Sequence, residues 1–302
     1  MPHPPLFSVL IANYNNGKYL QEAIESVFAQ TYSNWEIIIV DDGSVDNSKE
    51  ILDTFLTDKK IHIFYNEQNK GCGFTKRKCI EMAHGDLCGF LDADDVLLSD
   101  ALEAHADIHL QKPDISCCFS RFYTCDEHLN IIDELRLLQK TGDLSYFENG
   151  DYMPEHFASF KRSMYSQTPG ISPILLAAVD QDLYFKLEEV APIFVLDKFT
   201  YKYRNTPRQI SQNEKSYGAL LWNLMVRQET VSRRKLPQDN PAAIALYSKV
   251  RDLSLELYSD RCNRIALQQV QKTLEGIQSS NAYRLGKKIL SLLSWTQKPK
   301  HF

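Results

Sequence analysis

Three aspartates follow the end of a short apolar stretch, and their type and spacing suit a cation site. Asp92, Asp94 and Asp95 come directly after residues 87–91, which are apolar enough to form a buried strand. Carboxylates this close repel one another unless a cation neutralises them, and hard divalent ions such as Mg²⁺ and Mn²⁺ prefer oxygen ligands. The alternative is a structural one, in which Asp94 or Asp95 caps a helix that begins near Ser99.

The pattern of apolar segments predicts how the chain would position these aspartates. Strands are expected at residues 7–11, 37–40, 61–65 and 87–91, and segments with helical periodicity lie between them. Such alternation is typical of a parallel, doubly wound α/β sheet, which binds its ligands at the carboxyl ends of the strands. That edge would collect a set of mostly polar residues: Ala12, Asn13, Tyr14, Asp41, Asp42, Lys76, Asp92, Asp94 and Asp95.

The glycine-containing loops of this region limit how phosphates could be bound. Neither the loop at Gly43 nor the loop at Gly71 and Gly73 matches a dinucleotide fingerprint or a phosphate-binding P-loop. The diphosphate of a bound nucleotide would therefore depend on a metal ion rather than on a helix N-terminus.

Composition and charge exclude several classes of protein. The chain has 302 residues and a net charge of −5, which argues against a nucleic-acid binder. Its seven cysteines form no Cys-x-x-Cys pair, a pattern that favours a reducing cytoplasm over a disulfide framework. Neither a signal peptide nor an apolar stretch long enough to span a membrane is evident, so we expect a cytoplasmic protein.

Three ordered motifs resemble those of family-2 glycosyltransferases with the GT-A fold. They are residues 8–15 (Ser-Val-Leu-Ile-Ala-Asn-Tyr-Asn), 39–44 (Ile-Val-Asp-Asp-Gly-Ser) and 90–95 (Phe-Leu-Asp-Ala-Asp-Asp), and the likeness extends over roughly the first 210 residues. The resemblance implies a mixed, mostly parallel sheet flanked by helices. It also implies inverting transfer from a nucleotide diphosphate sugar, usually a UDP-sugar, with Mn²⁺ or Mg²⁺ as cofactor. The acceptor would be a saccharide or lipid-linked hydroxyl in cell-surface polysaccharide synthesis.

The resemblance also implies roles for individual residues. Ala12 and Tyr14 would flank the base, Asp41 would accept a hydrogen bond from it, Asp92 would lie near the ribose or sugar, and Asp94 would hold the metal. A structural alternative for Asp41 is a turn formed with Asp42 and Gly43.

The chain departs from the family pattern where an arginine is usual. Lys76 stands in that place, and Arg77 replaces the asparagine that follows it. A lysine still offers a cation to the base or the phosphates, but it lacks the bidentate fork of arginine. Alternatively, Lys76, Arg77 and Lys78 belong to a solvated helix face, because three consecutive residues cannot all face the site.

The catalytic base is expected at the start of a later helix. Asp180 lies just ahead of that helix and matches the aspartate of the family's Glu-Asp pair, although Val179 replaces the glutamate. Asp182 is the second candidate, and capping of the helix is the structural alternative for Asp180. After Tyr203-Arg204 the family often has a histidine that can bind metal, whereas this chain has Thr206.

The domain organisation expected from the sequence has two parts. Residues 1–213 would form the GT-A domain, with a nucleotide-binding half at 1–97 and an acceptor half at 98–213, and residues 214–302 would form a helical extension. Within the extension, residues 283–295 combine leucines and Trp295 with basic residues. Such a segment either lies at the inner face of a membrane or packs on protein, including a partner subunit of an oligomer.

Two alternatives come from other classes of protein. A non-catalytic nucleotide-sugar binder is suggested by Val179 and Thr206, which replace two expected functional residues. The Asp92-x-Asp94 spacing also fits a haloacid-dehalogenase-like phosphatase. That family places the motif after its first core strand, however, and here three strand-helix units precede it.

Overall fold

The structure is a computed structural model that describes residues 3–134, 145–149, 156–206 and 216–250, except 238, 242 and 247. The chain divides into two compact units, residues 1–213 and 214–302. The tail at 283–295 lies outside the described residues.

The first unit is built on a mixed sheet whose order is β3-β2-β1-β4-β8-β6-β9-β5, with β7 paired to β6. Strands β1 to β4 are mutually parallel, and β6 and β9 form a second parallel pair. Between them lies β8, antiparallel to both β4 and β6. The strands are β1 (Phe7–Asn13), β2 (Trp35–Asp41), β3 (Ile61–Tyr65), β4 (Leu87–Phe90), β5 (Val96–Leu97), β6 (Cys117–Cys125), β7 (Ile131–Glu134), β8 (Ser159–Lys161) and β9 (Ile193–Arg204).

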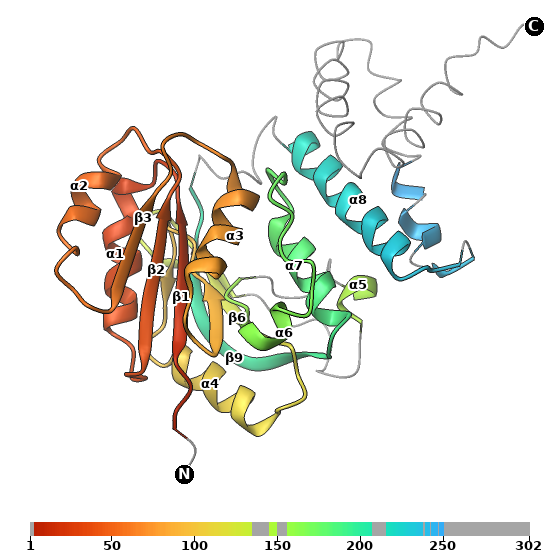
Figure 1. Ribbon diagram of the computed structural model, residues 1–302, viewed down its shortest axis with the longest axis horizontal. Helices are drawn as coiled ribbons and strands as arrows, with labels where there is room; N and C mark the ends of the chain where they lie inside the picture. Colours follow the sequence, from red (N-terminus) through yellow and green to blue (C-terminus); the bar gives the residue numbers. More distant parts are fainter. Residues whose placement is uncertain are drawn as a thin grey trace, which may run out of the picture. The chain divides into compact units, whose positions relative to one another are not determined.

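Helices cover both faces of this sheet (Figure 1). Val9 and Ile39 point to one face and belong to a core cluster with Leu20 of α1 and Leu102 of α4. The α3 helix packs on β1 and β2 from the other face. The helices are α1 (Gly17–Phe28), α2 (Ser48–Asp53), α3 (Cys72–Met82), α4 (Ala101–Gln111), α5 (Tyr146–Asn149), α6 (Arg162–Tyr165) and α7 (Val179–Glu188).

The α/β class expected from the sequence is confirmed, and the helix-capping alternative for the acidic triplet is wrong. The short strand β5 follows Asp95 directly and pairs with β9, so the chain stays in the sheet after the triplet. The next helix, α4, begins at Ala101, and Asp100 occupies its N-cap position. Asp94 and Asp95 therefore lie between two strands, at the end of the sheet, and not at a helix start.

In the second unit, the described residues are helical over 216–233 and over most of 241–250. The α8 helix (Ser216–Arg233) buries several apolar side chains, among them Trp222, Leu224 and Val226. Within the described stretches of the chain, no helix is both long and apolar enough to cross a membrane.

Candidate functional site

Lys76 lies at the centre of the candidate site. Its ammonium Nζ is 2.7 Å from Asp180 Oδ1 and 3.4 Å from Asp92 Oδ1, and it sits 4.9 Å from the centre of the Phe90 ring. The side chain is 7% exposed, because α3 turns this position toward the sheet. One buried cation thus joins α3, the end of β4 and the start of α7, and the solvated-face alternative for Lys76 is wrong.

The charges of this triad stabilise one another. Burial alone would lower the pKa of Lys76, but the carboxylates of Asp180 and Asp92 raise that pKa well above its usual value. Burial would likewise raise the pKa of Asp92, and Lys76 lowers it below the ordinary value for aspartate. Lys76 and Asp92 are therefore both charged at neutral pH.

For the two following aspartates, burial and neighbouring negative charge raise the pKa more than the nearby cations and hydrogen-bond donors lower it. Burial, and then the charge of Asp92, raise the pKa of Asp94 to about 6. Asp95 is buried and accepts hydrogen bonds from the Tyr201 hydroxyl and the Arg204 backbone N–H, each at 2.7 Å. Burial, followed by Asp94 and Asp92, still raises its pKa well above the usual range. Carboxyl groups in this state are those that a bound cation would stabilise in their charged form.

His156 completes a group of side chains able to bind a metal, and the sequence did not reveal it. Ligand atoms of Asp92, Asp95 and His156 lie within 4.8 Å of one another. Burial lowers the pKa of His156, which keeps the imidazole in the neutral form that metals bind. The ring stacks on Tyr203 with centroids 4.1 Å apart. The family resemblance indicates a histidine at position 206, and no motif surrounds His156 to mark it.

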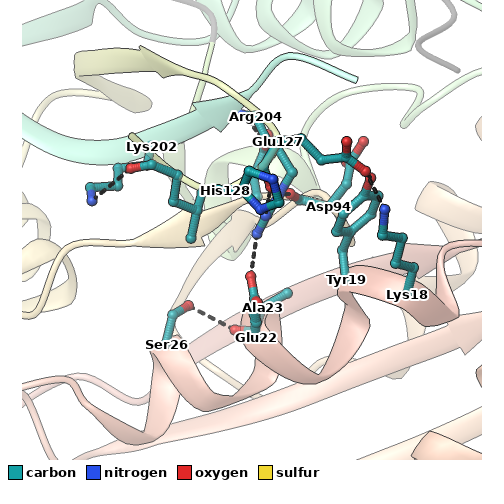
Figure 2. Close-up of polar contacts among 12 residues, drawn as sticks. Lys18, Tyr19, Glu22, Ala23, Ser26, Asp94, Glu127, His128, Lys202 and Arg204 are labelled. Atoms are coloured by element: carbon teal, nitrogen blue, oxygen red, sulfur yellow. Dashed lines mark hydrogen bonds and ion pairs between the residues drawn. The ribbon is translucent and has the colours of Figure 1, made fainter. Parts of the chain in front are cut away.

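Arg204, at the end of β9, holds the acidic segment in place (Figure 2). Its guanidinium donates 2.6 Å to the Asp94 carbonyl and also binds the Glu127 carbonyl and the Glu22 carboxylate. The same group lies over the Tyr19 ring, 4.6 Å from its centre. Although charged, Arg204 is only 2% exposed, so it connects α1, the acidic segment and the turn after β6 from inside the protein.

Asp41 and Asp42 end β2 and shape the neighbouring loops. Asp41 accepts hydrogen bonds from the Asn13 amide at 2.7 Å and from the Ser44 hydroxyl and backbone N–H at 2.7 and 2.9 Å. A carboxylate has about four acceptor sites, so the contacts within the described part of the chain leave one open. Asp42 binds the backbone N–H groups of residues 70 and 71, each at 2.9 Å, which is a structural role. The turn after Asp42 requires a φ of +71° at position 43, which glycine adopts without strain.

The end of β1 supplies the other residues expected to contact a base. Ala12 is half-buried within β1, and Tyr14, just beyond the strand, is 45% exposed. Between them, buried Asn13 has a side-chain oxygen with no hydrogen-bond partner within the described part of the chain. Because the end of β1 lies between the ends of β2 and β4, these residues share an edge with Asp41 and Asp92.

The structure distinguishes between Asp180 and Asp182, the two candidates for the catalytic general base. Asp180 lies in the first turn of α7, not ahead of it, and its side chain is 38% exposed. Ala178, which precedes the first residue of α7, has the left-handed backbone conformation, with φ of +56°. Asp182 is 1% exposed and lies 2.7 Å from buried Lys186, so its carboxylate cannot reach an acceptor. The second candidate is therefore wrong.

Sequence comparisons agree with the motifs. The family model described as glycosyl transferase family 2 matches residues 8–168. The chain is 29% identical over 210 residues to a chondroitin synthase of Escherichia coli, which covers 65% of this chain and 28% of that protein. Across three curated relatives the chain spans between 28% and 45% of the relative's length.

Solved structures share the fold. S. aureus TarS 1–349 in complex with UDP-GlcNAc superposes with a TM-score of 0.69 at 17% identity, covering 90% of this chain and 81% of that one. The mannosyltransferase PcManGT of Pyrobaculum calidifontis, in complex with GDP-Man and Mn²⁺, has a TM-score of 0.55 at 13% identity, with 99% and 82% coverage. The fold is GT-A, and the phosphatase alternative is wrong: the chain belongs to glycosyltransferase family 2.

Proposed function

We propose that the protein transfers a sugar, with inversion, from a UDP-sugar to an acceptor hydroxyl in the synthesis of a cell-surface polysaccharide. The observation that carries this proposal is the Asp180–Lys76–Asp92 triad. It places a part-exposed carboxylate one side chain away from the acidic cluster at the carboxyl ends of the strands. The curated relative named as a chondroitin synthase and the solved structure with UDP-GlcNAc support the donor and the product class.

Asp180 would act as the general base. Inversion requires a single in-line displacement, in which a base removes the proton from the acceptor hydroxyl as that oxygen attacks the sugar carbon. Lys76 fixes the Asp180 carboxylate through one oxygen, at 2.7 Å, and leaves the other to accept the proton. Lys76 is therefore a positioning residue for the base.

The acidic cluster fits a divalent cation such as Mn²⁺ or Mg²⁺. Asp92, Asp95 and His156 offer ligand atoms within 4.8 Å of one another, and burial with the charge of Asp92 raises the pKa of adjacent Asp94 to about 6. Of these two ions, Mn²⁺ tolerates an imidazole ligand better than Mg²⁺, which prefers oxygen ligands alone. When bound, the ion would supply positive charge to the departing diphosphate. We assign Asp94 to this ion, with His156 in the role that the family resemblance gives to a histidine at position 206.

The remaining contacts follow from the order of the strands. Residues 1–97 would form the nucleotide-binding half, in which Ala12 and Tyr14 flank the nucleobase of the donor and Asp41 accepts a hydrogen bond from that nucleobase. Residues 98–213 would form the acceptor half, which contributes Asp180. The open acceptor site on Asp41 and the Asn13 side-chain oxygen, which has no partner in the described part of the chain, support a polar contact with the nucleobase.

A donor screen tests the proposal. Binding is measured by calorimetry with UDP-, GDP- and dTDP-sugars, with and without Mn²⁺. We expect a UDP-sugar to bind, and only when the metal is present. Asp94→Asn should lose that requirement together with most of the affinity, because a ligand charge facing a cation is removed. Metal-independent binding that Asp94→Asn leaves unchanged would contradict the proposed site. The anomeric configuration of the product, measured by NMR, tests inversion.

A non-catalytic nucleotide-sugar binder is the remaining alternative, because Val179 and Thr206 replace two functional residues of the family pattern. Incubating the bound donor with a panel of saccharide acceptors separates the two functions. Donor binding without turnover on any acceptor would favour the binder. The exposure of Asp180 at the start of α7 favours the enzyme.

A further inference from the structure

A second cluster of ligating side chains lies at the amino ends of the strands, away from the acidic edge. Glu36 is the second residue of β2, His62 the second residue of β3, and His84 lies in the loop between α3 and β4. Ligand atoms of these three residues lie within 4.8 Å of one another. Glu36 and Asp41 belong to the same strand, five residues or about 17 Å apart, so the cluster is separate from the candidate active site.

The Glu36 carboxylate is fixed by the protein through one oxygen. Oε1 accepts hydrogen bonds from the Ser8 hydroxyl at 2.6 Å and from the backbone N–H groups of His84 and Gly85 at 2.7 and 3.2 Å. Its other oxygen, Oε2, faces the two imidazole rings. Burial would raise the pKa of Glu36, but the hydrogen bonds from Ser8 and His84 lower it below its ordinary value. The carboxylate is therefore both oriented and charged.

The distances around Oε2 match those of a tetrahedral metal site. His84 Nδ1 lies 3.1 Å from Oε2, and His62 Nε2 lies 3.5 Å from it. Two ligands of a tetrahedral Zn²⁺ with bonds near 2.0–2.1 Å are roughly 3.3 Å apart. A proton shared between Glu36 and His84 would account for the shorter distance alone. It would not account for a second ring nitrogen facing the same oxygen.

We infer that Glu36, His62 and His84 form a binding site for Zn²⁺ or a similar first-row divalent ion, with water in the fourth position. Two imidazoles and a carboxylate are a ligand set that zinc prefers, whereas Mg²⁺ prefers oxygen ligands alone. Ser8 and the backbone of residues 84 and 85 orient the carboxylate ligand, as outer-shell groups do in known sites. The bound ion would join β2, β3 and the loop before β4, and so stabilise the fold at the edge opposite the catalytic one.

The test measures zinc directly and does not depend on transferase activity. The full chain is titrated with Zn²⁺ against a chromophoric chelator in excess Mg²⁺, which occupies oxygen-rich sites. His62→Ala and His84→Ala should each weaken zinc binding by at least the roughly 10–100-fold known for changes in supporting residues. Both side chains are substantially exposed, at 39% and 68%, so the variants should fold. His128→Ala, at an exposed histidine elsewhere, is the matched control.

X-ray absorption at the zinc edge identifies the ligands. Two imidazoles in the first shell are expected for this cluster, whereas zinc at the acidic edge would show one, from His156. Zinc should also raise the melting temperature of the wild type and of His128→Ala, but not that of the two other variants. Equal zinc affinity in wild type and His62→Ala, or fewer than two imidazole ligands, would overturn the inference. None of these results depends on whether the proposed transfer reaction occurs.

Discussion

At the scale of single residues, one buried ammonium group organises the proposed chemistry. Lys76 holds a carboxylate from the end of β4 and another from the start of α7, two segments that are far apart in the sequence. A buried charge with two partners is costly to disturb, because removing it leaves like charges facing each other. The geometry of the base and that of the acidic cluster are therefore linked through Lys76.

Asp180→Asn should lower turnover without unfolding the protein. Asparagine keeps the shape of the side chain but cannot take a proton, so kcat should fall by roughly 10²–10⁴. Asp180 is 38% exposed and Lys76 keeps Asp92 as a counter-charge, so the loss of stability should be modest. Donor affinity should also hold, because the base serves the acceptor. Steady-state kinetics and calorimetry on the same preparation measure both.

Asp182→Asn is the control for that experiment and should behave in the opposite way. It leaves Lys186 buried at 3% exposure without a counter-charge, which costs about 3–5 kcal/mol of stability. The surviving folded protein should keep its turnover per folded molecule. Near-wild-type transfer by Asp180→Asn would show that another residue is the base.

Lys76→Met should reduce turnover and should also weaken the fold. Its two carboxylate partners are 38% and 42% exposed and can be hydrated once the lysine is gone. The loss of stability should therefore be about 1–2 kcal/mol, below the value for a fully buried pair. Lys76→Arg keeps the charge and should retain more turnover than Lys76→Met. Urea unfolding and steady-state kinetics measure the two effects. Equal turnover of the two variants would contradict a role for the positive charge at position 76.

At the scale of elements, α4 is attached to β8 through two histidines that share one hydroxyl. His105 Nδ1 and His109 Nε2 lie 2.7 and 2.9 Å from the Ser159 hydroxyl. Burial, with the neighbouring charge of His109, lowers the pKa of His105 to about 3. Burial, with Lys161, lowers the pKa of His109 to about 4. Both rings are therefore neutral in the folded protein under ordinary conditions.

Acid should destabilise the protein through these two histidines. In the unfolded chain each takes up a proton near pH 6.5, whereas in the folded chain each does so only near pH 3–4. Their contribution to the free energy of unfolding is complete above about pH 6.5. It is lost as the pH falls toward 4, by up to about 1.4 kcal/mol per pH unit for each ring.

Urea unfolding at pH 7.5 and pH 5 measures this dependence. His105→Asn with His109→Gln preserves the nitrogen that each ring turns toward Ser159 and should flatten the dependence, whereas exposed His128→Asn should leave it unchanged. An equally steep loss of stability in the double variant would assign the acid sensitivity to carboxylates.

The elements were predictable to different degrees, for physical reasons. The strand at 61–65 has the predicted bounds, because apolar periodicity is a local property. The burial of Lys76 and its pairing with Asp180 depend on tertiary contacts that no local pattern encodes. His156 was missed for the same reason, since stacking on Tyr203 brings it to the aspartates. Motifs thus located the edge of the sheet but not all the side chains that complete it.

At the scale of the whole molecule, the C-terminal tail gives a prediction about membranes. Residues 283–295 combine leucines, Trp295 and basic side chains, and we propose that they bind an anionic membrane surface. Deleting residues 281–302 should abolish co-sedimentation with anionic liposomes, while the full chain should sediment with them less strongly as salt rises. Neutral liposomes are the control. Undiminished sedimentation of the truncated chain would contradict the proposal, and a lower melting temperature would indicate a tail packed on protein.

The hydrogen bonds from the end of β9 to the acidic segment also determine when that segment can fold during synthesis of the chain. Asp95 is held by Tyr201 and Arg204, which come 106 and 109 positions later in the chain. Synthesis proceeds from the N-terminus, so the ribosome releases every donor-site motif well before these two partners. The emerging chain therefore carries three closely spaced acidic groups without the scaffold that orders them. The acidic segment reaches its final geometry only after Arg204 has left the ribosome, so a nascent or prematurely terminated chain lacks it.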